Sequence, residues 1–84
     1  MVHVLVVEDD VRFNQIVCAS LNAAGYAVQG CTNASEAFDA LHDSGADIII
    51  SDIMMPGIDG FEFVEDVRRI NKRIPVSYTH LRAH

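Results

Sequence analysis

Short apolar segments alternate with helical patterns along the whole chain. Residues 3–7 form a run that is apolar on both faces, as a buried parallel strand is. From residue 11 to residue 24 apolar side chains recur at helical spacing, and residues 26–31 then form a second strand-like run. This alternation of strand and helix predicts an α/β fold built on a parallel sheet.

The same alternation continues through the second half of the chain. Asn33 and Glu36 have the spacing of a helix capping box, and the apolar stripe after them predicts a second helix. Residues 47–51 predict a third strand, residues 61–70 a third helix, and residues 75–76 the opening of a fourth strand. We therefore expect helices on both faces of a doubly wound sheet, joined by right-handed crossovers.

Two of the predicted strands end at acidic residues. Glu8, Asp9 and Asp10 follow the first strand, and Asp52 follows the third. In a parallel sheet of this kind the functional crevice lies outside the carboxyl ends of the strands, so these acids belong at one edge. If the first and third strands are neighbours, their axes are about 4.8 Å apart and the carboxylates are crowded. Such crowding raises a carboxyl pKa or recruits a cation.

Carboxylate oxygens in an open, partly hydrated pocket suit Mg²⁺. We expect Glu8, Asp9 and Asp52 to bind this ion, and the backbone carbonyl of Met54 is within reach as a further ligand. A carboxylate beside bound Mg²⁺ is also a competent nucleophile toward a phosphoryl group, and the product is an aspartyl phosphate. The metal neutralises the charge that develops on the transferred group.

Several polar residues have plainer structural interpretations. Asp10 directly precedes a helix and is interpreted mainly as its N-cap. Asp9 could also cap this helix, but the presence of acidic residues at two strand ends favours a functional site. Asp59 precedes a glycine and suits a turn. His80 and His84 are four residues apart, a spacing that binds zinc on a helix, but no further ligand is close in sequence.

Composition and charge narrow the class of protein. The chain has 84 residues, 50 % of them hydrophobic and 21 % charged, which is typical of one small folded domain. Its formal net charge of −6 argues against a nucleic-acid-binding surface. No apolar run approaches the ~20 residues of a membrane span, and we identify no signal peptide. Cys18 and Cys31 lack metal-ligand spacing and are interpreted as buried, reduced thiols of a cytoplasmic protein.

The acidic segments resemble those of the receiver domains of two-component response regulators. Residues 4–10, VLVVEDD, resemble the first strand and acidic pair of that family. Residues 48–60, IIISDIMMPGIDG, resemble its phosphoacceptor strand and the loop that follows. Shorter matches fall at residues 25–26 and 33–37, and the resemblance extends from residue 2 to about residue 76.

The resemblance implies a function and a role for each site residue. Asp52 matches the phosphorylated aspartate, Glu8 and Asp9 match the acidic pair that holds Mg²⁺, and the Met54 carbonyl matches another metal ligand. The implied fold is a flavodoxin-like sheet with strand order 2-1-3-4-5, incomplete here after the start of the fourth strand. The implied partner is a histidine kinase or phosphotransfer protein that supplies the phosphoryl group. A receiver catalyses at most its own phosphorylation and dephosphorylation, so we do not expect an enzyme.

The end of the chain departs from the family pattern. The Ser/Thr switch residue that ends the family's fourth strand is matched in position by His80, with Thr79 one residue early. A shift by one residue reverses the face to which a strand side chain points. The lysine of the family's fifth strand has no counterpart. We therefore divide the chain into a partial receiver domain, residues 1–76, and an atypical tail, residues 77–84, that we hypothesise to be foreign sequence.

Two other functions fit parts of the pattern. A receiver-like interaction module would keep the acidic motif without switching, because the Thr and Lys elements are missing. A metal-dependent phosphatase with an aspartyl nucleophile usually has a second aspartate two residues later, where this chain has Met54. An incomplete sheet also leaves an unpaired hydrophobic strand, so we expect the chain to be marginally stable or to self-associate through that edge.

Overall fold

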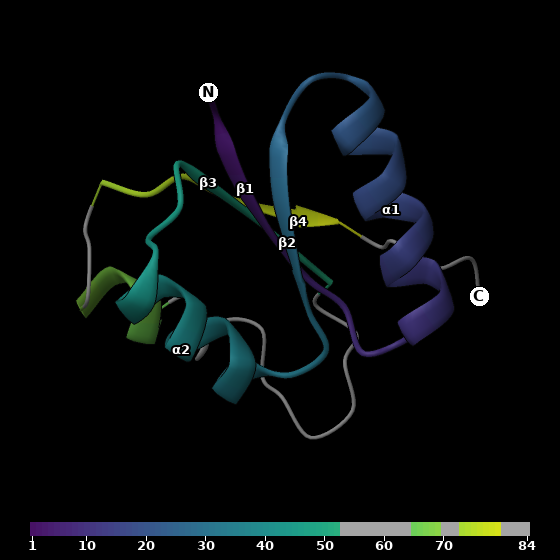
Figure 1. The fold of residues 1–84 in the computed structure, drawn as a ribbon. Coiled ribbons are helices and arrows are strands. Elements are labelled where there is room, and N and C mark those ends of the chain that lie inside the picture. Colours follow the sequence, from purple (N-terminus) through teal and green to yellow (C-terminus); the bar gives the residue numbers. More distant parts are fainter. Residues whose placement is uncertain (53–64, 70–72, 80–84) are drawn as a thin grey trace.

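Four parallel strands form the centre of the structure, a computed structural model that describes residues 1–52, 65–69 and 73–79 (Figure 1). Their order across the sheet is β2-β1-β3-β4, and each neighbouring pair is parallel. The predicted alternation of strand and helix is confirmed. The elements are β1 (His3–Val7), α1 (Val11–Ala23), β2 (Ala27–Cys31), α2 (Ala34–Asp43), β3 (Ile48–Asp52) and β4 (Val76–Thr79).

The observed boundaries differ from the predicted ones by one residue at several ends. Tyr26 precedes β2, because its backbone N–H donates to Leu21 O at 3.2 Å and so belongs to the turn after α1. Asp47 precedes β3, and its carboxylate accepts from the His3 N–H at 2.8 Å. Asp52 is the last residue of β3 and does not follow it. Of the predicted third helix, residues 65–69 are helical, and the remainder lies outside the described residues.

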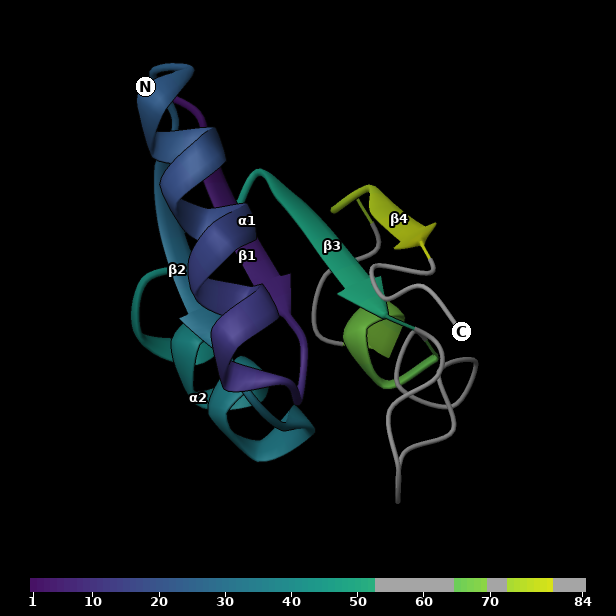
Figure 2. The ribbon, with the colours of Figure 1, turned by 90° about the vertical axis from the view of Figure 1, so that its right-hand side faces the viewer.

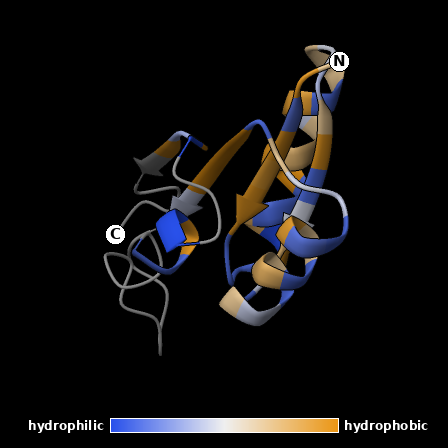
Figure 3. Ribbon diagram, turned by 90° about the vertical axis from the view of Figure 1, so that its left-hand side faces the viewer, coloured by the Kyte–Doolittle hydropathy of each residue, from blue (hydrophilic) through white to orange (hydrophobic). Residues whose placement is uncertain are grey.

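The two faces of the sheet are covered by different helices (Figures 1 and 2). On one face, Leu5 and Ile49 pack with α2 residues such as Ala37 and Leu41 in the main apolar cluster. On the other face α1 lies across β2 and β1, and leaves β3 and β4 at its side (Figure 2). The central strands β1 and β3 are the most hydrophobic part of the sheet (Figure 3). Full burial of a side chain such as Leu5 contributes about 1.5–3 kcal/mol.

The helices α1 and α2 each begin at a side-chain cap. Asp10 caps α1 by accepting from the Phe13 N–H at 2.9 Å, which confirms its predicted structural role. Asn33 caps α2 by accepting from the Glu36 N–H at 2.8 Å. Past the end of α1, Gly25 has φ of +100°, a left-handed conformation that glycine adopts without steric cost.

The cysteines differ in burial. Cys31 is 1 % exposed and belongs to the main apolar cluster, as predicted. Cys18 is only partly buried, so the prediction of a buried thiol is wrong there. It lies next to Gly30 of β2, which is an edge strand in the described sheet. Both thiols are free. Among the helices of the described residues, none has the length and apolar character needed to cross a membrane.

Candidate functional site

The carboxyl ends of β1 and β3 lie side by side. The two strands are neighbours, which is the condition for the predicted crowding of their acidic residues. Val7 pairs with Ser51 in their parallel register. Glu8 directly follows β1, and Asp52 directly follows Ser51 as the last residue of β3. The backbone positions of the two acidic residues therefore share one edge of the sheet.

The Glu8 side chain is completely buried at this edge. Its backbone is held from both sides, because the N–H donates to Cys31 O at 2.9 Å and the carbonyl accepts from Asn14 Nδ2 at 3.0 Å. Asp9, the next residue, is half-buried. Burial of an ionised carboxylate is costly unless charge or hydrogen bonds compensate it. The strand end therefore has the properties of a cation-binding position.

The described donors fit a hard divalent cation. Glu8 and Asp9 offer carboxylate oxygens only, which are the ligands that Mg²⁺ prefers, and this ion needs only one or two protein carboxylates. The buried position of Glu8 lowers the local dielectric, so a dication there is attracted more strongly than at the surface. The residues present are therefore compatible with magnesium.

Two of the predicted metal ligands, the Asp52 side chain and Met54, are not among the parts of the chain that the structure describes. The backbone of Asp52 pairs with Thr79 of β4, but its side chain is not among those described. Within the described residues, no three His, Cys, Asp or Glu side chains form a group that could hold a metal ion. The ligand set of Glu8, Asp9, Asp52 and Met54 thus stays a prediction. Outside the described residues lie Met54, Asp59, His80 and His84.

One polar residue of this region escaped prediction from the sequence. Asn14 of α1 is 5 % exposed, and its amide nitrogen donates to two backbone carbonyls at the site edge, Glu8 O at 3.0 Å and Cys31 O at 2.9 Å. Asn14 falls on the buried stripe of the helix, one residue after Phe13 and three before Val17. A polar side chain on an otherwise apolar stripe was the signal that could have found it.

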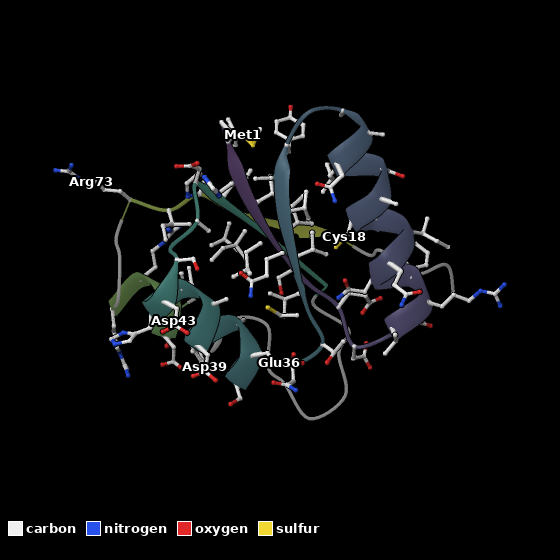
Figure 4. The ribbon with its side chains drawn as sticks, viewed as in Figure 1. Met1, Cys18, Glu36, Asp39, Asp43 and Arg73 are labelled. Carbon is white, nitrogen blue, oxygen red and sulfur yellow. The ribbon has the colours of Figure 1, made fainter. Side chains whose placement is uncertain are left out.

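The acidic side chains of α2 lie on the side of the molecule away from α1 (Figure 4). Glu36 is in the first turn of this helix, where the Thr32 hydroxyl and backbone N–H donate to its carboxylate. These hydrogen bonds stabilise the charged form and lower the pKa of Glu36. Asp39 and Asp43 are exposed further along α2. We interpret this set as a capped, solvated helix face and not as part of the site.

Comparison with known proteins identifies the sequence pattern. Residues 4–80 match the family described as the response regulator receiver domain. The two-component response regulator ORR27 of Oryza sativa subsp. japonica is 42 % identical over an aligned length of 77 residues, and the match covers 88 % of this chain and 12 % of the rice protein. The chain also spans only about a third of the length of two other curated relatives.

Solved structures give the same fold. The chemotaxis response regulator CheY4 of Vibrio cholerae superposes with a TM-score of 0.85 at 38 % identity, over 93 % of this chain and 67 % of that one. The response regulator TrrA of Thermotoga maritima, in complex with Mg(2+)-BeF, gives a TM-score of 0.82 at 30 % identity. That match covers 90 % of this chain and 66 % of TrrA.

Proposed function

The chain belongs to the response regulator receiver family, and on that premise we propose that it accepts a phosphoryl group on Asp52 in a Mg²⁺-dependent phosphorelay. Membership makes it a receiver domain of two-component signalling, typically a non-enzymatic signalling module. The observation that carries the proposal is the parallel register of β1 and β3, which sets Glu8 and Asp52 at one edge of the sheet.

In the proposed reaction, Asp52 is the nucleophile. One of its carboxylate oxygens attacks the phosphorus of a phosphohistidine, the new P–O bond forms as the P–N bond breaks, and the histidine leaves with its electron pair. Glu8, Asp9 and the Met54 carbonyl are the proposed magnesium ligands beside Asp52. When bound, the ion supplies positive charge against the oxygens of the transferred group. The complex of TrrA with Mg(2+)-BeF supports this assignment through a relative.

The proposed phosphoryl donor is a cognate histidine kinase or phosphotransfer protein, since a receiver domain implies such a partner. We propose a cytoplasmic location, because the two free thiols persist in a reducing compartment. We also propose residues 1–76 as the receiver unit and residues 77–84 as foreign sequence, although this boundary falls inside β4 and the family match reaches residue 80. The tail proposal is refuted if the parent gene carries the same residues in a normal genomic context.

The test is intact-protein mass spectrometry after incubation with acetyl phosphate and MgCl₂. We expect one phosphoryl addition that is lost with EDTA and lost in Asp52→Asn. Asp43→Asn, which removes an exposed carboxylate of α2, is the matched control and should be phosphorylated like the parent chain. Equal phosphorylation of Asp52→Asn would contradict the proposal.

A receiver-like module that does not switch is the second candidate. It is favoured by the sequence, where His80 stands at the position that matches the family's Ser/Thr switch. Phosphorylation of a switching receiver should move the backbone amide resonances of residues 53–60. Phosphorylation without such changes, and without altered partner binding, would favour the second candidate.

A further inference from the structure

We propose that Asn14 is a positioning residue for the metal site, because it ties the segment that carries Glu8 and Asp9 to the end of β2. This inference rests on the proposed function, since it concerns the same acidic edge. Asn14 does not touch the reacting groups in this proposal. It acts through the backbone of Glu8.

The amide of Asn14 bridges two separate strand ends. Its Nδ2 donates to Glu8 O at 3.0 Å, just beyond β1, and to Cys31 O at 2.9 Å, the last residue of β2. The Glu8 N–H donates to the same Cys31 carbonyl at 2.9 Å. Glu8 is therefore fixed through both its N–H and its carbonyl.

The orientation of the Asn14 amide follows from its partners. Backbone carbonyls only accept hydrogen bonds, so the NH₂ group must face Glu8 O and Cys31 O. The amide oxygen then faces the Cys18 thiol one helical turn further, which donates to Asn14 Oδ1 at 3.3 Å. Cys18 lies on the side of α1 toward the sheet (Figure 4). Each polar atom of the Asn14 side chain thus has a partner.

The sheet leaves space for this amide only at a glycine. A Cβ atom built at Gly30 would lie 3.2 Å from Asn14 Cγ and closer still to Oδ1. It would also lie 3.0 Å from Cys18 Sγ. The Asn14 amide therefore occupies space that a side chain at residue 30 would take, next to the Cys31 carbonyl to which it donates.

This arrangement matters for a metal site because ligands bind more tightly when their backbone is held before the ion arrives. Residues that hydrogen-bond to metal ligands and orient them typically change metal affinity by about 10- to 100-fold when they are removed. Asn14 belongs to α1, which is capped at its start, so its hydrogen bond to Glu8 O fixes the acidic segment of Glu8 and Asp9 relative to that helix. A residue that only stabilised the fold would affect unfolding without changing the Mg²⁺ affinity of the folded chain.

The test compares Mg²⁺ binding of three forms of the chain by calorimetric titration with MgCl₂, at a temperature where circular dichroism shows each one folded. Asn14→Ala should raise the Mg²⁺ dissociation constant by about 10- to 100-fold. Asn22→Ala makes the same change at an exposed position of α1 and should leave the constant unchanged. Equal affinity of Asn14→Ala and the parent chain overturns the inference and leaves the proposed function standing.

A second measurement uses the parent chain, so it does not depend on how well Asn14→Ala folds. In ¹⁵N NMR spectra, MgCl₂ should shift the side-chain amide resonances of Asn14, while those of the exposed Asn22 and Asn33 stay in place. An Asn14 amide that does not respond while Mg²⁺ binds overturns the inference. A parent chain that binds no Mg²⁺ overturns the proposed function as well.

Discussion

Gly30 of β2 lies directly beneath Asn14 of α1, so closely that a Cβ atom at residue 30 would come within 3.2 Å of Asn14 Cγ and nearer to Oδ1. The contact between helix and sheet at this point depends on the absence of one methyl group. Asn14 is 5 % exposed and bound to two carbonyls, so a displacement that made room for a methyl group would weaken these hydrogen bonds.

Gly30→Ala should therefore lower the free energy of unfolding by about 1–3 kcal/mol, as overpacking of an interior does. The measurement is urea denaturation followed by circular dichroism. In the double variant Asn14→Ala with Gly30→Ala the added methyl group meets less crowding, so the combined loss should be smaller than the sum of the single losses. Strictly additive losses would contradict a direct contact between the two residues.

The N-terminal cap of α2 provides a second test. The Asn33 side chain accepts from the Glu36 N–H at 2.8 Å and satisfies a backbone donor that the helix itself leaves unpaired. Asn33→Ala should cost about 1 kcal/mol of unfolding free energy. Asn33→Asp keeps an oxygen acceptor and is the matched control, with an expected loss of no more than a few tenths of a kcal/mol. Equal stabilities of the two variants would argue against the cap.

The pKa of Glu36 gives a pH-dependent prediction. The Thr32 hydroxyl is the main cause of the lowered pKa, and the Thr32 N–H adds to it. Because the folded-state pKa is below the unfolded one, the stabilisation is present above the unfolded value near 4.5 and is lost as pH falls through the folded value. Thr32→Val should raise the pKa of Glu36 toward its ordinary value, measured by ¹³C NMR titration of the carboxyl carbon. An unchanged titration curve would contradict this cause.

How much of the structure the sequence predicts depends on how local each signal is. The strands and caps follow from patterns a few residues long, such as the run that forms β1 and the spacing of Asn33 and Glu36. Whether the backbones of Glu8 and Asp52 share one sheet edge depends on the strand order. The sequence pattern did not fix that order, and the observed register of β1 and β3 does. The role of Asn14 was not predictable in this way, since its partners in β2 are 16 and 17 residues away in sequence.

The two cysteines should differ in their reaction with iodoacetamide. Burial is the main cause that raises the pKa of the Cys31 thiol to about 11, and the charge of Glu36 adds to it. The thiolate is the reactive form, so Cys31 should react far more slowly at pH 8 than the partly exposed Cys18, whose pKa burial also raises. Peptide mass spectrometry gives both rates. In urea the rates should become similar, and a fast reaction of Cys31 in the folded chain would contradict its burial.

The outer side of β4 offers a place for another strand. Ile49 N–H donates to Pro75 O at 3.0 Å, which places the backbone groups of residues 75 and 77 toward β3. Since successive residues of a parallel strand pair on alternate sides, the groups of Val76 and Tyr78 point to the other side of β4. In the part of the chain that the structure describes, β4 is an edge strand. Such an edge is a template for pairing with a second chain.

We therefore expect the 84-residue chain to associate with itself in a concentration-dependent manner, measured by analytical ultracentrifugation. Tyr78→Pro removes one outward N–H, and proline is tolerated on an edge strand in that orientation, so this variant should shift the equilibrium toward monomer. Ser77→Pro removes an N–H that faces β3 and is the matched control, because it should lower stability without blocking the outer side. Monomeric behaviour of the parent chain at all concentrations, or equal association of parent and Tyr78→Pro, would show that this edge does not pair.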